Sequence, residues 1–121
     1  MQEKWVTTRL LFERFPCTTR QKQSLIKLEF LGKKEIPEEL PFIRALAVVA
    51  GLAAHQRGLP QMAPTVAVVL ALQGDPKDYL LVYEGRRSRP EVVESDEFVA
   101  RAAIVIELDY LVEIVQGCIA L

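Results

Sequence analysis

Side chains able to do acid–base, nucleophilic or metal chemistry are scarce in this chain. It has one histidine, His55, together with two cysteines near opposite ends and three serines. One histidine and two distant cysteines do not supply the spacing of a metal site. No serine has a histidine or another base at the spacing of a known nucleophile motif. The glycines do not form a loop of the kind that binds phosphate groups. The sequence therefore predicts no metal and no cofactor, and it favours a protein that is not an enzyme.

Glu107 is the carboxylate most surrounded by apolar residues in the sequence pattern. If residues 96–116 form one helix, Glu107 lies in the middle of an apolar face and needs a charged or hydrogen-bonding partner. Arg44 and His55, on the thin polar stripe of a buried helix, are the candidate partners. These three residues are the candidate site of a small enzyme or ligand carrier. If the segment is a strand instead, Glu107 faces water, and that position or a structural ion pair is preferred to catalysis.

Residues 85–90 form a compact basic loop, with three arginines within four positions: Arg86, Arg87 and Arg89. Guanidinium groups bind phosphate or carboxylate oxygens in a fork geometry. With Tyr79 and Tyr83 beside them, these arginines suit single-stranded nucleic acid, which is bound by stacking and charge together. The alternative is a solvated loop that faces the neighbouring acids, Glu84, Glu91 and Glu94.

Charge is distributed unevenly along the chain. Residues 1–34 carry eight Lys or Arg against three Glu, whereas residues 35–121 carry seven Lys or Arg against thirteen Asp or Glu. A basic arm on an acidic, apolar body suggests a surface that meets an anionic partner. The candidate nucleic-acid contacts of this arm are Arg9, Arg14, Arg20 and Lys27. The sequence pI of 5.9 argues against a general nucleic-acid coat protein, so only an accessory role is considered.

The ends of the chain and its cysteine content bear on location. The first residues lack the apolar core of a secretory signal and two cysteines are too few for a disulfide scaffold, so we expect a cytoplasmic protein. The apolar runs 45–54 and 63–72 are shorter than the ~20 residues that span a bilayer, so no transmembrane segment is expected. The last four residues, from Cys118 to Leu121, resemble a prenylation signal. No basic anchor precedes them, and a packed helix end is the preferred interpretation.

A helical hairpin over residues 41–73 is the clearest predicted element of a single domain, residues 1–121. Pro41 suits a first helical turn, Arg57 lies at the end that favours a cation, and Gly58 ends the helix. A second helix follows from about residue 64 to residue 73. Small residues allow the two helices to approach closely: Ala47, Gly51 and Ala54 on the first, and Ala63, Ala67 and Ala71 on the second.

The remaining segments are ambiguous between helix and strand. Residues 95–115 are predicted as a C-terminal helix, although the alternation around Ile104 and Ile106 also suits a strand. Thr18 and Gln21 are placed for a capping box. Residues 5–12 and 25–31 could instead pair as a hairpin. We therefore predict a mainly α fold, with an α+β fold containing this N-terminal hairpin as the alternative.

The function predicted from these patterns is association with proteins. Apolar residues surround the 98–115 segment more fully than the core of a small domain requires. The chain is thus expected to be a non-enzymatic interaction or assembly module that binds a second copy of itself and could also bind another protein. The alternatives are the accessory nucleic-acid-binding subunit and the small enzyme or carrier based on Glu107 and His55.

Overall fold

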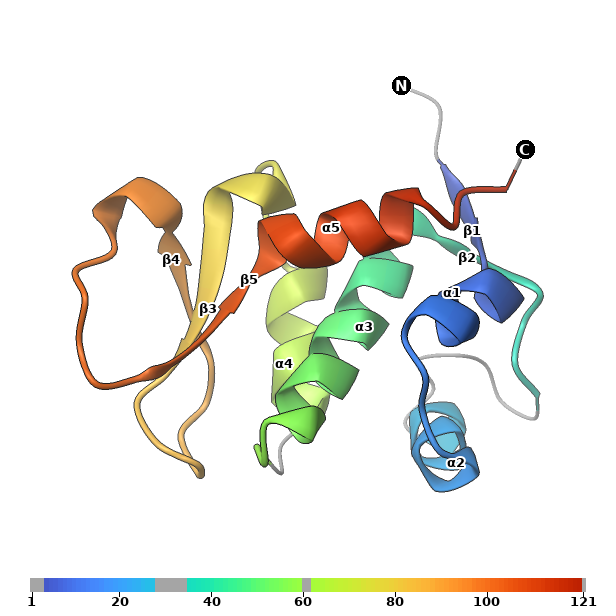
Figure 1. The fold of residues 1–121 in the computed structure, drawn as a ribbon, viewed down its shortest axis with the longest axis horizontal. Coiled ribbons are helices and arrows are strands. Elements are labelled where there is room, and N and C mark those ends of the chain that lie inside the picture. The colour runs from blue at the N-terminus through green and yellow to red at the C-terminus, as the bar shows by residue number, and fades with distance from the viewer. Residues whose placement is uncertain (1–3, 28–34, 60–61, 121) are drawn as a thin grey trace.

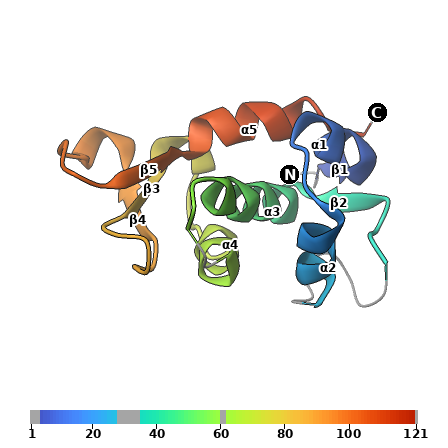
Figure 2. The same cartoon turned by 60° about the horizontal axis from the view of Figure 1, so that its bottom comes forward.

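The chain folds as a mixture of helices and two small antiparallel sheets. The computed structural model describes residues 4–27, 35–59 and 62–120, and about half of the chain is helical. The prediction of a mainly α fold is therefore wrong, because five strands accompany the five α-helices of the described residues. The sheets lie on either side of a central helix pair (Figures 1 and 2).

The elements follow one another in this order along the described chain. They are β1 (Trp5–Thr7), α1 (Thr8–Arg14), α2 (Thr19–Lys27), β2 (Glu39–Pro41), α3 (Phe42–Gln56), α4 (Met62–Leu70), η1 (Pro76–Asp78), β3 (Tyr79–Tyr83), β4 (Glu91–Glu94), η2 (Ser95–Glu97), β5 (Ile104–Glu107) and α5 (Leu108–Gln116). None of the described helices has the length and apolar character that crossing a membrane requires.

Both helices of the predicted 41–73 hairpin are present, and α3 is the centre of the molecule. Every residue of α3 from Ala45 to Ala54 is buried. Gly51 faces α4, where a side chain would meet Met62 and Val66. The small residue at this position lets the two backbones approach closely, as predicted for the first helix. The alanines predicted to face it from the second helix do not, because Ala67 and Ala71 are exposed and α4 ends at Leu70.

The predicted stop of α3 at Gly58 is confirmed, and its geometry is a Schellman motif. The Leu59 amide donates to the Ala54 carbonyl at 3.1 Å, and the Gly58 amide donates to the His55 carbonyl at 3.0 Å. Gly58 has a φ of 80°, a left-handed conformation that glycine adopts without steric cost. Leu59 is buried beside the helix end, so the chain leaves α3 in a fixed direction.

The larger sheet has the order β4-β3-β5 and packs with one face on the helices. In its register Leu81 lies between Val92 and Ile106. Side chains alternate between the two faces of a strand, and Leu81, Tyr83 and Ile106 belong to the main hydrophobic core with α3. β3 is the central strand, which leaves the outer sides of β4 and β5 as the edges of this sheet.

Residues 95–115 are not one helix. They form the short turn η2, then a connection, then β5, and α5 begins only at Leu108. The β-branched run that starts at Ile104 pairs with β3, and the buried residues of α5 follow with helical spacing: Leu108, Leu111, Val112 and Val115. The segment that looked like one helix with apolar residues all round is thus a strand followed by an amphipathic helix.

The N-terminal third contains helices, so the alternative hairpin is also incorrect. Residues 8–14 and 19–27 are helical, and residues 28–31 of the proposed partner strand lie outside the described residues. The capping box is present: the Thr18 amide donates to Gln21 Oε1 at 2.7 Å, and the Gln21 amide donates to Thr18 Oγ1 at 3.1 Å. β1 pairs with β2 instead, more than thirty residues away along the chain.

Candidate functional site

The arginine-rich connection between β3 and β4 is a tight turn at one end of the larger sheet. The Ser88 amide donates to the Gly85 carbonyl at 3.1 Å, which places Arg86 and Arg87 at the two central positions. These two arginines and Arg89 are all exposed. The predicted loop is therefore an outward-facing turn rather than part of the core.

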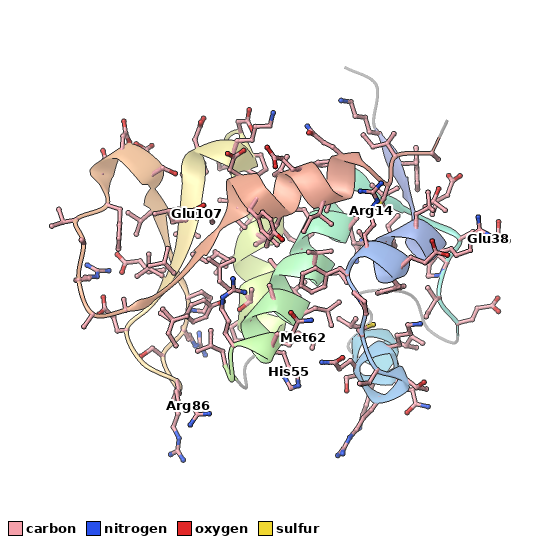
Figure 3. All side chains as sticks on the ribbon, viewed as in Figure 1. Arg14, Glu38, His55, Met62, Arg86 and Glu107 are labelled. Atoms are coloured by element: carbon pink, nitrogen blue, oxygen red, sulfur yellow. The ribbon has the colours of Figure 1, made fainter. Side chains whose placement is uncertain are left out.

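Arg86 folds back over the end of α3. A Cβ atom added to Gly58 would lie 3.1 Å from a terminal nitrogen of Arg86, so the guanidinium group occupies the space above this glycine. Figure 3 shows Arg86 at the same end of the molecule as His55, which belongs to the last turn of α3. The contact joins two segments that are far apart in the sequence, and it places Arg57 next to the turn.

The acidic neighbours of the turn are held by another residue. Arg101 forms salt bridges with Glu84 at 2.7 Å and with Glu91 at 3.2 Å. The third acid of the solvated-loop alternative, Glu94, lies at the far end of β4. Two of the three acids in the solvated-loop alternative are therefore bound to Arg101, and the third lies away from the turn.

The two tyrosines of β3 do not offer stacking surfaces beside the turn. Tyr83 is 1% exposed, and its hydroxyl is hydrogen-bonded to that of Thr65 in the core. Burial raises the pKa of Tyr83, and this effect outweighs the opposing influence of the Thr65 hydrogen bond and the Arg57 charge. Tyr79 lies at the opposite end of the strand. Neither ring is therefore available for base stacking beside the turn arginines.

The basic residues of the N-terminal third are separate from the turn. Arg9 and Arg14 belong to α1, and Arg20 and Lys27 belong to α2, on the other side of the central helices (Figure 1). Arg14 packs against Gly117 at the end of α5, where its positive charge is favoured by the helix dipole. The seven candidate cations thus form two groups, not one continuous surface.

Glu107, Arg44 and His55 do not form a site. Arg44 is in the first turn of α3 and His55 in the last, roughly 16 Å apart along the helix axis. Glu107 is exposed at the junction of β5 and α5, not buried on a helix face. The buried ion pair expected for a helical segment is therefore wrong. The strand alternative, in which Glu107 faces water, agrees with its position at the end of β5.

A small pocket lies along the outer edge of β5. It has a volume of about 230 Å³ and is lined by Arg57, Val105, Ile106, Glu107, Tyr110 and Leu111. Three of these residues are consecutive in β5. Neighbouring residues of a strand point to opposite faces of the sheet. A pocket lined by three consecutive residues therefore lies along the edge of the strand and not on one face. We call it the β5 edge pocket.

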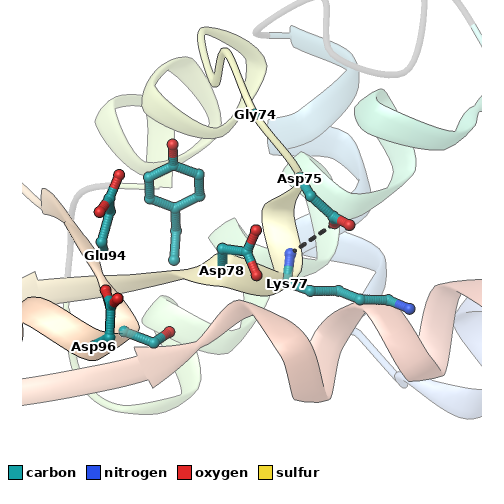
Figure 4. Close-up of a pocket in the computed structure, with 8 residues that line it drawn as sticks. Gly74, Asp75, Lys77, Asp78, Glu94 and Asp96 are labelled. Carbon is teal, nitrogen blue, oxygen red and sulfur yellow. Dashed lines mark hydrogen bonds between the residues drawn. The ribbon is translucent and has the colours of Figure 1, made fainter.

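A second pocket, of about 470 Å³, is acidic and was not predicted from the sequence. It is lined by Gly74, Asp75, Lys77, Asp78, Tyr79, Glu94, Ser95 and Asp96 (Figure 4). The register of β3 and β4 explains this pocket, because Tyr79 at the start of β3 pairs with Glu94 at the end of β4. The acidic residues just before β3 therefore lie beside those just after β4. No group of three metal-ligating side chains occurs within the described ranges, so these carboxylates are not arranged as a metal site.

No family model, curated protein or solved structure matches this chain.

Residues 118–120 pack into the fold. The Thr7 amide donates to the Cys118 carbonyl at 2.9 Å, and the Ala120 amide donates to the Trp5 carbonyl at 2.8 Å. Cys118 is fully buried, and burial raises the pKa of its thiol. The preferred interpretation of a packed helix end agrees with these contacts, whereas Leu121 lies outside the described residues.

Glu107→Gln is expected to leave stability nearly unchanged. The side chain is exposed and makes no salt bridge with another described residue, so the free energy of unfolding should change by less than about 0.5 kcal/mol. Urea denaturation followed by circular dichroism measures this. A loss of roughly 3 kcal/mol or more would instead indicate that Glu107 is buried and paired, which is the helical alternative of the sequence analysis.

Proposed function

We propose that this chain is a protein-interaction module that self-associates through the outer edge of β5. The observation that carries the proposal is the β5 edge pocket. Within the described residues, no backbone hydrogen bond joins the outer side of β5 to another segment. An unpaired strand edge offers amide and carbonyl groups to a strand from another chain.

The exposed apolar side chain at this edge supports the same function. Tyr110 lines the pocket and is 59% exposed. Large apolar side chains with this exposure are costly in water and are common at interfaces, where tyrosine is enriched. Most other apolar residues of the 98–115 segment pack within the chain, so the proposed surface is smaller than the sequence suggested.

Charge complementarity favours a second copy of the chain as the partner. Arg57 and Glu107 line the same pocket, yet they form no salt bridge with each other. A two-fold axis beside β5 presents the same surface twice and pairs the strands in opposite directions. Each copy then contributes one cation and one anion, so Glu107 of one copy can meet Arg57 of the other.

A charge-reversal series tests this arrangement. We expect the wild-type chain to sediment as a dimer at micromolar concentration. Glu107→Arg and Arg57→Glu should each raise the dimer dissociation constant about tenfold or more, because each places like charges together. The double variant should recover most of the affinity. A wild-type monomer, or a double variant as weak as the sum of the single variants, would contradict the proposal.

The location that we propose is the cytoplasm. Cys17 and Cys118 are both free, which suits a reducing compartment.

A further inference from the structure

Three exposed arginines belong to two neighbouring segments, the end of α3 and the β3–β4 turn with the residue that follows it. We call Arg57, Arg86 and Arg89 the arginine cluster. Arg57 directly precedes Gly58, whose open face is covered by the Arg86 guanidinium group, and Arg89 follows the same turn. The positive φ of Gly58 and its missing side chain both permit this close approach.

The cluster has many hydrogen-bond donors that the protein does not use. Arg57 donates from one terminal nitrogen to the Ala53 carbonyl at 3.2 Å. Arg86 and Arg89 make no hydrogen bond or salt bridge with any residue in the described part of the chain. A guanidinium group carries five N–H donors in a planar fork that fits phosphate oxygens. All three side chains are exposed, and Figure 3 shows Arg86 at the end of the molecule.

The negative charges next to the turn do not neutralise Arg86 and Arg89. Glu84 and Glu91 are both bound to Arg101. The acidic pocket lies at the start of β3, whereas the turn follows its end, about 14 Å along the strand. That separation exceeds the Debye length of about 8 Å at physiological ionic strength. Arg86 and Arg89 therefore have no counter-charge among the described residues, and a bound anion would supply one.

We propose that the arginine cluster binds phosphate groups, either of an inorganic polyphosphate or of a nucleic-acid backbone. Several phosphates in succession match several cations better than a single carboxylate does, and arginine binds each phosphate through two parallel hydrogen bonds. Tyr83 is buried and Tyr79 lies in the acidic pocket, so neither tyrosine of β3 stacks on bases here. Recognition is therefore of phosphates, without a preference for base sequence.

The test compares two double variants of the full chain that lose the same charge. Arg86→Gln with Arg89→Gln removes two cations of the cluster. Arg9→Gln with Arg20→Gln removes two exposed cations from α1 and α2 and serves as the control. The probes are tripolyphosphate, by calorimetry, and a labelled oligothymidylate of about 20 nucleotides, by fluorescence anisotropy over a series of salt concentrations.

We expect the cluster variant to weaken binding of at least one probe about tenfold or more and the control to weaken it less than about twofold. For the single-stranded oligonucleotide, the slope of log affinity against log salt should fall by about 1.4 units, roughly 0.7 for each cation removed. Binding of tripolyphosphate alone identifies a polyphosphate site, and binding of the oligonucleotide alone identifies a backbone site. Absence of binding to both probes, or equal losses in the two variants, overturns the proposal.

Two further measurements keep the result interpretable. Because Arg86 packs over Gly58, the single variant Arg89→Gln, which removes no such contact, should still weaken binding when the fold is unchanged by circular dichroism. Arg86 and Arg89 do not line the β5 edge pocket, so the cluster variant should remain as dimeric as the wild type. Loss of phosphate binding and loss of self-association are thus distinguishable.

Discussion

Gly51→Val is expected to destabilise the protein by about 3 kcal/mol or more. A Cβ atom at this position would lie 2.8 Å from Met62 Cγ and 2.9 Å from Val66 Cγ2, and valine adds two further methyl groups. α3 is buried along most of its length, so it cannot move away from α4 without opening the core. Urea denaturation should show a lower midpoint with an unchanged slope.

Two controls distinguish overpacking from a general effect of replacing glycine. Gly85→Ala should change stability by less than about 1 kcal/mol, because the nearest atom to its new Cβ would be Ser88 Oγ at 3.6 Å. Met62→Ala combined with Gly51→Val should recover part of the loss, since the shortened side chain makes room for the valine. A midpoint for Gly51→Val equal to that of the wild type would mean that α3 and α4 do not pack at this position.

The α3–α4 pair could be predicted because its signals are local. Pro41 and Gly58 mark the ends of α3, and the run of small residues between them indicates close packing. The same reasoning located the turn arginines on an exposed loop. It could not place Arg86 against Gly58, because that contact depends on how the sheet lies against α3, which no short-range pattern encodes.

The strands were harder to predict for the same physical reason. β1 pairs with β2 across more than thirty residues, and both are three residues long. β5 and α5 adjoin without a turn residue between them, so a strand-like alternation runs directly into a helical repeat. The prediction of one helix over residues 95–115 is wrong because Ile104 and Ile106 pair with residues of β3 and form a strand. Glu107 lies at this boundary, so the helical alternative placed it on a buried face, whereas the strand alternative placed it in water as observed.

Leu111→Asp is expected to prevent stable folding, whereas Tyr110→Asp should leave the fold intact. Leu111 is 2% exposed and packs in the core, so a carboxylate there is desolvated without a partner and costs roughly 4 kcal/mol or more. Tyr110, its neighbour on α5, is 59% exposed, so the same new charge should change stability by less than about 1 kcal/mol. Thermal melts followed by circular dichroism separate the two variants.

The pair also separates two explanations of the apolar 98–115 segment. If its leucines and valines form an interface between copies, as the sequence suggested, Leu111→Asp should give a folded monomer. If they form the core of one chain and the interface lies at the β5 edge, Leu111→Asp should unfold and Tyr110→Asp should be the folded variant with a weaker dimer. Light scattering of each variant over a concentration series distinguishes these outcomes, and a Tyr110→Asp dimer of wild-type affinity would exclude the β5 edge pocket from the interface.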